Sequence, residues 1–445
     1  MPKWLGGADS QKGLAIAGSA WTVIGFGGSQ IIRLGSNLVL TRFLMPEIFG
    51  VMALIQVVIQ AIQMLSDIGI STSVIRAKQG DDPDYLDTAW TLQVLRGLLI
   101  WVFACSMAYP MSIIYEAAEL LLLIPVVAMS GLIQGFQSPA ILTLRRHINI
   151  KGLVGWQIAS QSVTTLITIV AVWHFRSIWA IAVGGVLGAF IGCLMSYKFP
   201  RLSNLRFKLD GTAQTDILNF GKWIFVSSFI SFFINKGDIL ILGISMTKAE
   251  LGVFSIAAIW ARVALDLLLK INSQVLTPLY AIAFRHEDVT SINVKIHKAR
   301  MGLLIISLPI CWILIVGSHS IIGFLYDPRY ASAGWMLQIL GIGTVAAAIT
   351  AASANALLAF GDSFSFMLFQ AIRGALLVAC MSFGGVHFGV IGLIAGISIS
   401  KFISYPFLAV LLHRHKIWLP SLDCWAFLIS TIVVGSWFWW MYVYQ

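Results

Sequence analysis

The sequence predicts an all-α membrane protein that crosses the bilayer many times. The chain of 445 residues is 58% hydrophobic and 11% charged, whereas soluble domains carry about 25% charged residues. Apolar stretches recur from end to end, and a stretch of about 20 residues can cross about 30 Å of hydrocarbon. These stretches do not alternate at every second residue, so a porin-like barrel is excluded.

Thirteen membrane spans are expected, within a range of 12–14. They are 15–41, 48–70, 87–109, 118–138, 153–173, 178–197, 217–243, 250–277, 301–325, 332–359, 364–385, 388–412 and 425–443. The first apolar run continues to Thr41. It therefore predicts a membrane helix and not a cleaved signal peptide. No loop between the spans is long enough for a soluble domain.

Basic residues in the loops predict the orientation. With the N-terminus in the cytoplasm, the opposite loops hold only Arg42, Arg176, Lys248 and Arg329. All other loop lysines and arginines then lie inside, as the positive-inside rule requires. This topology accounts for the net charge of +10, so no nucleic-acid partner is expected. The thirteenth span places the C-terminus outside.

The two halves of the chain share a pattern. The segment PEIFGV after the first span resembles AELGV after the seventh, and Gly50 and Gly252 each open the next helix. Glycines at helical spacing, which let helices approach closely, occur in both the sixth and the twelfth span. Six spans separate the matched elements, so two bundles of the same orientation are expected. We expect one bundle in 1–200, a second in 201–416 and an additional helix in 417–445.

Cations within the apolar segments are the main functional signal. A cation at the bilayer centre costs about 2.5–3.5 kcal/mol on insertion scales. Several of them, with fewer acids at depth, predict a water-filled cavity that attracts an anion. The six candidates are Arg33, Arg96, Lys236, Arg262, Arg373 and Lys401.

Arg33 and Lys236 occupy matched positions in the two halves. Arg33 lies 17 residues before Gly50, and Lys236 lies 16 residues before Gly252. Both positions fall about 10–14 Å below the outer surface at 1.5 Å per residue. We expect the two side chains to face each other across a central cleft and to bind phosphate. The alternative is that both snorkel to the interface.

Three acidic residues are candidates for ion coupling or charge pairing: Asp67, Asp238 and Asp266. Asp266 recurs at a four-residue spacing with Arg262 and Lys270, which indicates either a cavity-lining stripe or an intrahelical ion network. Asp238 follows Lys236 by two residues and is either its partner or a titrating carboxylate.

Polar stripes occur on other spans. Gln56, Gln60 and Gln63 share one face of the second span, and a polar stripe on a membrane helix faces protein or water. Glutamine suits sugar hydroxyls, and helix–helix hydrogen bonding explains the stripe equally well. The same two interpretations apply to the glutamines of the fourth and fifth spans, Gln134, Gln137, Gln157 and Gln161.

Motifs for catalysis and metal binding are missing from the sequence. The five cysteines are scattered without a CxxC pair, so neither a disulfide framework nor a metal site is indicated. No Walker motif and no nucleophile–base motif occurs. We therefore expect no catalytic residue, no metal and no cofactor.

Five sequence segments carry a family resemblance. They are LTRFLMPEIFGVMALIQVV, DIGISTSVIR, DTAWTLQVLRG, KGDILILGISMTKAELGVFSIA and LYDPRYASAGWMLQILGIG. In this order and spacing, the chain resembles the polysaccharide transporter (lipid-linked oligosaccharide flippase, Wzx-like) family of the multidrug/oligosaccharidyl-lipid/polysaccharide exporter superfamily. The resemblance covers residues 15–412.

The resemblance implies a transporter and not an enzyme. Two six-helix bundles around a central cavity would move an undecaprenyl-diphosphate-linked oligosaccharide to the outer leaflet of the bacterial inner membrane by alternating access. Cations that related flippases place in the first, seventh and eighth spans correspond to Arg33, Lys236 and Arg262. Proton or sodium coupling is expected, and the expected protein partners are a polysaccharide polymerase and chain-length or export proteins.

Three other membrane functions share part of this pattern. A multidrug or metabolite antiporter of the same superfamily typically uses cavity acids to capture cations, whereas cations dominate here. A peptidoglycan lipid II flippase is chemically closer. A membrane glycosyltransferase or polymerase usually has a large outer loop, which this sequence lacks.

Overall fold

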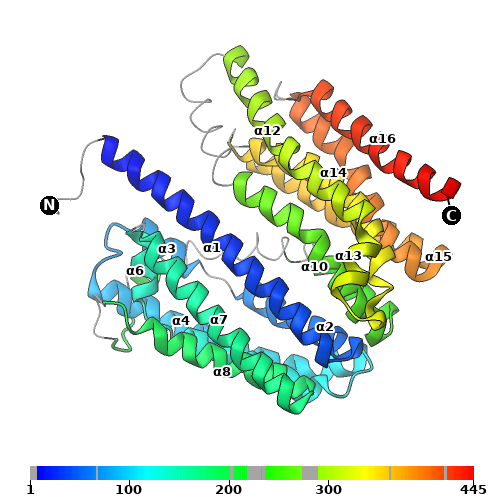
Figure 1. Cartoon of the computed structure of the whole chain (residues 1–445). Helices are drawn as coiled ribbons and strands as arrows, with labels where there is room; N and C mark the ends of the chain where they lie inside the picture. Colours follow the sequence, from blue (N-terminus) through cyan, green and yellow to red (C-terminus); the bar gives the residue numbers. More distant parts are fainter. Residues whose placement is uncertain are drawn as a thin grey trace. The chain divides into compact units, whose positions relative to one another are not determined.

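The computed structural model describes residues 8–66, 69–147, 149–200, 205–211, 213–215, 217, 232, 236–272, 289–359, 362–414 and 418–444. These residues contain helices and connecting segments but no strand. The chain forms two compact units, an N-terminal unit of residues 1–232 and a C-terminal unit of residues 233–445 (Figure 1). The domain boundaries expected from the sequence remain predictions, since most residues between 201 and 235 lie outside the described part.

The described helices confirm an all-α protein with many membrane spans. Eight of them are long and apolar enough to cross a membrane, or up to ten if each of two bent helix pairs forms one span. Thirteen spans were expected. The difference arises partly because the expected span 217–243 lies largely outside the described residues, and partly because two expected spans form the single helix α15.

The N-terminal unit contains eight described helices. They are α1 (Ala8–Phe43), α2 (Pro46–Leu65), α3 (Ile70–Arg76), α4 (Pro83–Ile114), α5 (Leu120–Gly135), α6 (Ala140–Arg146), α7 (Ile150–Phe175) and α8 (Ile178–Ser196). Their starts follow from local sequence. Pro46 and Pro83 lie in the first turns of α2 and α4, where the missing N–H costs no helical hydrogen bond. The Asn149 side chain accepts a hydrogen bond at the start of α7.

The C-terminal unit begins with helical residues 236–245. It continues with α10 (Lys248–Ile271), α12 (Val289–Val316), α13 (Ser318–Leu325), the 3-10 turn η2 (Pro328–Tyr330), α14 (Ala333–Ala359), α15 (Ser363–Arg414) and α16 (Pro420–Tyr444). Thr247 and Glu250 form a capping box at the start of α10. Gly50 is the fifth residue of α2 and Gly252 the fifth of α10, so the two related segments open their helices in the same register.

Small residues set the closest helix contacts. On α8, Gly184, Gly188 and Gly192 pack against hydroxyl-bearing residues of α7, and a Cβ at Gly188 would lie 2.3 Å from the Thr164 hydroxyl. The glycine spacing of the sixth span thus lets α7 and α8 pack closely, as small residues do in membrane bundles.

Helix α15 contains two arms. The helix breaks at Gly389, which has φ 58° and ψ −140°. A Cβ at Gly384 would lie 2.1 Å from the Gly392 carbonyl oxygen, and one at Gly396 would lie 2.5 Å from the Cys380 carbonyl oxygen. The chain therefore turns back on itself, and the arms correspond to the expected spans 364–385 and 388–412.

Candidate functional site

The C-terminal unit contains a polar cavity of about 360 Å³. We call it the C-terminal cavity. Helices α10 and α14, both arms of α15, and Asp238 line it. Its polar side chains are Asp238, Arg262, Asp266, Thr344, Thr350, Gln370, Arg373, Ser400 and Lys401. Three of the six cations predicted from the sequence thus share one cavity with two of the three predicted acids.

Helix α10 contributes a cation and an acid from one face. Arg262 and Asp266 are four residues apart, so both side chains reach the cavity. An Arg262 Nη2 donates to the Asp238 Oδ2 over 3.3 Å, and the two side chains are 35% and 14% exposed. Arg262 is therefore paired and still accessible from the cavity. Lys270, one turn further along, is not among the lining residues.

The hairpin of α15 brings two further cations to the C-terminal cavity. Arg373 lies on the first arm and Lys401 on the second. The turn at Gly389 and the close glycine contacts between the arms bring these distant positions to one wall. Three cations against two carboxylates leave the cavity with a positive balance when all five groups are ionised. This arrangement suits an anionic ligand with several acceptor oxygens.

A second polar cavity, of about 330 Å³, lies within the N-terminal unit. We call it the N-terminal cavity. Its polar lining comprises Gln63, Ser71, Gln93, Arg96, Gln134, Gln137, Ser138 and Arg145, which come from α2 to α6 and from the α5–α6 connection. Among the described lining residues there is no Asp or Glu.

Arg96 binds the backbone of a neighbouring helix and also lines a cavity. Its guanidinium donates to the Gln63 carbonyl oxygen at 2.7 Å and to the Ser66 hydroxyl at 3.2 Å. It also lines the N-terminal cavity. The hydrogen bonds hold the guanidinium at the end of α2, so its position is fixed while part of it faces the cavity.

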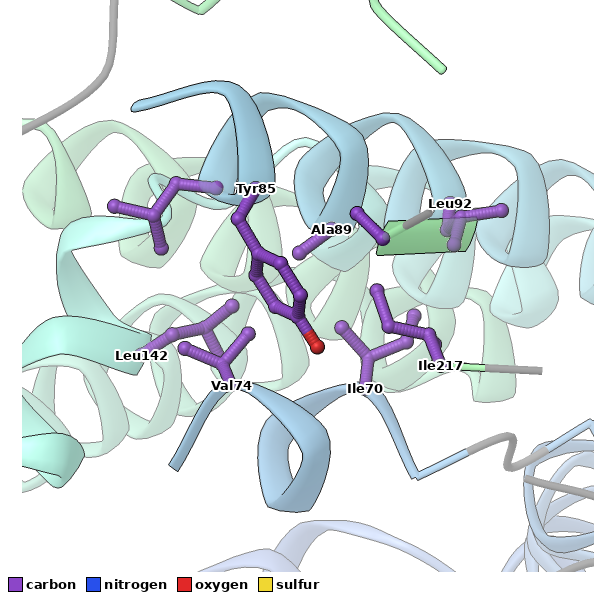
Figure 2. Packing of buried hydrophobic residues seen from close by; sticks show 9 residues of the cluster. Ile70, Val74, Tyr85, Ala89, Leu92, Leu142 and Ile217 are labelled. Atoms are coloured by element: carbon purple, nitrogen blue, oxygen red, sulfur yellow. The ribbon is translucent and has the colours of Figure 1, made fainter. Parts of the chain in front are cut away.

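A buried apolar cluster next to this cavity holds α3 and α6 in place. Figure 2 shows the Tyr85 ring of α4 lying against Ile70 and Val74 of α3, with Leu142 of α6 beside them. Ile217, from the segment that follows the N-terminal helices, packs on the same cluster. Burial of these side chains fixes α3 and α6, which carry Ser71 and Arg145 of the cavity lining.

Arg146, the last residue of α6, ties α6 to the end of α3 and to the connection that follows α3. It donates to the carbonyl oxygens of Val74 at 2.7 Å and Ala77 at 2.8 Å, and to Asp81 at 3.0 Å. His147 contacts the other oxygen of Asp81 at 2.9 Å. Burial alone would raise the pKa of Asp81, but its hydrogen bonds with Arg146 and His147 outweigh this effect and lower the pKa below 3.8.

The remaining predicted residues lie elsewhere. Arg33 is exposed on α1, and Lys236 is half-buried at the start of the C-terminal unit but is not among the lining residues of its cavity. Gln56 is exposed and Gln60 half-buried on α2. Asp67 lies outside the described residues. The phosphate clamp of Arg33 and Lys236 therefore remains a prediction.

Some lining residues were missed or left undecided by sequence reasoning. Gln93 was not considered, although it precedes Arg96 by three residues and so shares its helical face. Arg145 was assigned only to a basic loop. Gln161 proves to be a helix–helix contact, because its amide nitrogen donates to the Ser29 carbonyl oxygen of α1 at 3.1 Å.

In the described part of the chain, no group of three His, Cys, Asp or Glu side chains could hold a metal ion.

Comparison with solved structures establishes the fold. Lipid II flippase MurJ in an inward closed conformation superposes with a TM-score of 0.71 at 14% identity, covering 95% of this chain and 92% of that chain. An inward-facing multidrug resistance MATE family transporter of the MOP superfamily gives a TM-score of 0.66 at 14% identity, covering 92% of this chain and 95% of that one.

Sequence comparison gives the family. The lipopolysaccharide biosynthesis protein WzxC of Escherichia coli (strain K12) is 24% identical over 405 residues, covering 87% of this chain and 79% of the relative. Residues 39–335 match the family described as polysaccharide biosynthesis protein. Because this match spans more than half of the chain, the protein belongs to the polysaccharide biosynthesis protein family.

Proposed function

We propose that the protein is a flippase that moves lipid-linked oligosaccharide repeat units across the bacterial inner membrane. Family membership and the fold support a transporter in polysaccharide biosynthesis. The observation that carries the proposal is the grouping of Arg262, Arg373 and Lys401 on one cavity of a membrane-spanning unit. Cations at such depth are costly unless they face water or a ligand.

The proposed substrate is an undecaprenyl-diphosphate-linked repeat unit of exopolysaccharide, capsule or O-antigen. A diphosphate offers many acceptor oxygens and at least two negative charges. The planar guanidinium groups of Arg262 and Arg373 can each donate two parallel hydrogen bonds to phosphate, while Lys401 acts as a point charge. Thr344, Thr350 and Ser400 of the same lining can supply hydroxyl donors.

Asp238 would be the resident counter-ion of this site. It pairs with Arg262 at 3.3 Å. An arriving diphosphate can take over this guanidinium, which leaves the Asp238 carboxylate in a partly buried place without its partner. Binding a proton or Na⁺ at Asp238 or Asp266 would then offset the lost pairing. This exchange would couple transport to an ion gradient. It would also help the protein to alternate between its inward-facing and outward-facing states.

We place the N-terminus in the cytoplasm on the basis of the basic loops. The proposed direction of transport is from the cytoplasmic to the outer leaflet. A polysaccharide polymerase and chain-length or export proteins would use the product, since repeat units delivered outside must be joined there.

The test is complementation of a strain that lacks the gene. We expect the triple variant Arg262→Gln, Arg373→Gln, Lys401→Gln to abolish surface polysaccharide and to leave repeat units on the lipid carrier inside the cell. Arg329→Gln is the matched control, because Arg329 lies outside the long helices and pairs with Asp327 at 2.8 Å. Normal surface polysaccharide in the triple variant, at normal protein level, would refute the role of the C-terminal cavity.

A peptidoglycan lipid II flippase is the second candidate, which the fold likeness to MurJ favours. It shares the lipid diphosphate and differs in the attached sugar. Rescue of growth in a strain depleted of its lipid II flippase would identify this function, whereas restored surface polysaccharide alone identifies the first. The excess of cations over carboxylates in the C-terminal cavity disfavours an antiporter for cationic drugs.

A further inference from the structure

We propose that α16 positions Lys401 in the C-terminal cavity and that Tyr405 of α15 is the positioning residue. The inference rests on the proposed function, because Lys401 is one of the cations assigned there to the lipid diphosphate. None of the described lining residues of the cavity comes from α16. An effect of α16 on the ligand therefore passes through the helices that it packs against.

The second arm of α15 is weakened close to Lys401. Pro406 lies inside this arm, and a proline has no N–H to donate to the carbonyl oxygen four residues earlier, which is that of Phe402. The hydrogen-bond ladder of the helix is thus interrupted directly after Lys401, and helices bend at such points. Contacts with other helices must therefore fix the arm on both sides of Lys401 if this side chain is to keep one position.

The first anchor of the arm precedes Lys401 and leads to α14. The Ser398 hydroxyl donates to the Ile339 carbonyl oxygen of α14 at 2.7 Å. A Cβ at Gly343 of α14 would lie 2.5 Å from the Ser398 hydroxyl oxygen, so the two helices are in close contact here. This anchor fixes the turn of α15 before Lys401.

The second anchor follows Lys401 and leads to α16. The Tyr405 hydroxyl donates to Oδ2 of Asp423 at 2.8 Å and accepts from the indole N–H of Trp418 at 3.3 Å. Asp423 is fully buried, and its other oxygen pairs with Arg300 of α12. Tyr405 lies four residues after Lys401, which is about 6 Å along the helix. A shift of Tyr405 is therefore transmitted to Lys401 over about one helical turn.

Aromatic packing adds to the second anchor. The Phe427 ring of α16 lies edge-on to the Tyr405 ring with centroids 5.0 Å apart, and it packs against the Phe402 ring at 5.9 Å. Both geometries are favourable for aromatic pairs. Helix α16 thus contacts the arm at the residue next to Lys401 and again one turn later, and the two contacts together fix the rotation of the arm about its axis.

Another hydrogen bond of α16 leads to a different helix. The indole N–H of Trp312 on α12 donates to the Ser430 hydroxyl of α16 at 3.1 Å. Of the two hydrogen bonds, the one between Tyr405 and Asp423 reaches the arm that carries Lys401, whereas the one at Ser430 does not. Comparing them separates the positioning of Lys401 from the general anchoring of α16.

The test measures the affinity of the purified full-length protein for inorganic pyrophosphate by isothermal titration calorimetry. Lys401→Gln should weaken binding about tenfold, as expected for a lost hydrogen bond between charged groups. Tyr405→Phe leaves Asp423 paired with Arg300 and should weaken binding about fivefold, as expected for a displaced neighbour. In the Lys401→Gln background, Tyr405→Phe should cause no further loss, because it acts through Lys401.

Ser430→Ala is the matched control. It also removes one hydrogen bond of α16, so its Tm should fall about as far as that of Tyr405→Phe. Its affinity for pyrophosphate should equal that of the wild type. Phe427→Leu is a second variant at the same anchor and should repeat the non-additive effect with Lys401→Gln, so it decides if Tyr405→Phe does not fold.

Three results would overturn the inference. They are wild-type affinity in Tyr405→Phe, equal weakening in Ser430→Ala, and a full additional loss when Tyr405→Phe is combined with Lys401→Gln. The proposed function would stand after any of them, provided that the triple variant Arg262→Gln, Arg373→Gln, Lys401→Gln loses pyrophosphate binding. Wild-type affinity in the triple variant, or no binding to the wild type, would refute the diphosphate site and this inference with it.

Discussion

Single charged residues divide into two kinds in this protein. Arg262, Arg373 and Lys401 line an open cavity, whereas Arg300 of α12 is 1% exposed and forms an ion pair with Asp423 of α16. The sequence predicts a cytoplasmic loop position for Arg300, because this residue stands just before an apolar run. The start of α12 at Val289 places it inside the helix, and the partner 123 residues away could not be found from spacing.

This buried pair gives a stability prediction. Arg300→Leu leaves Asp423 buried, and among the described residues Tyr405 alone still donates to it, at 2.8 Å. We expect a loss of about 3–5 kcal/mol in the free energy of unfolding, because one partner of a buried pair remains without compensation. Thermal unfolding of the purified protein measures it.

The control for this stability prediction is Arg329→Leu, whose ion pair with Asp327 has side chains 37% and 29% exposed. Exposed pairs contribute about 0–1 kcal/mol. The double variant Arg300→Leu, Asp423→Leu should recover part of the loss. Equal effects of the two single variants would contradict the assignment.

Asp81 gives a pH prediction. Its pKa is lower in the folded protein than the ordinary value of 3.8, since contacts with Arg146 and His147 outweigh its burial. A lowered carboxyl pKa stabilises the fold above about pH 4 and loses this contribution as the pH falls through the folded pKa. The difference in Tm between wild type and Asp81→Asn should therefore shrink from about pH 6 to about pH 3. A constant difference would show that the carboxylate charge contributes nothing.

Helices were predictable where the apolar runs are long and bounded. The expected spans 48–70, 153–173 and 178–197 correspond to α2, α7 and α8 within a few residues. The bend of 70° between α12 and α13 was not predicted, because it lies inside the expected span 301–325, whereas the bend of 65° between α5 and α6 lies at the expected end of span 118–138. The hairpin of α15 was expected as two spans, but its role in joining Arg373 to Lys401 depends on tertiary packing.

The α15 hairpin gives a prediction at this scale. In Gly396→Ala the new Cβ would lie 2.5 Å from the Cys380 carbonyl oxygen, so the arms must separate. We expect a loss of about 1–3 kcal/mol, as for other overpacked sites, together with weaker pyrophosphate binding. Gly185→Ala is the control, because a Cβ added at this position of α8 would meet no atom within 4 Å. The Tm of both variants checks this, and a neutral Gly396→Ala would contradict the close contact.

At the scale of the whole molecule, the composition and the five family-like sequence segments were enough to predict an all-α transporter fold and its family. Four of the cations expected in apolar segments, Arg96, Arg262, Arg373 and Lys401, line cavities in the structure. The sequence could not show that they divide between two cavities, because Arg96 and Arg373 look alike in their apolar surroundings. Residues that meet across a hairpin or across α2 to α6 are joined by packing, which no local pattern in one sequence contains.

The central claim is that the cations of the C-terminal cavity carry the lipid diphosphate. The most direct measurement is flipping of a fluorescent polyprenyl-diphosphate oligosaccharide in vesicles that contain the purified protein, with an external quencher reporting the outer leaflet. The wild type and Arg329→Gln should move the lipid between leaflets, while Arg262→Gln, Arg373→Gln, Lys401→Gln should leave it in place. Flipping by this triple variant at the rate of the wild type would contradict the claim.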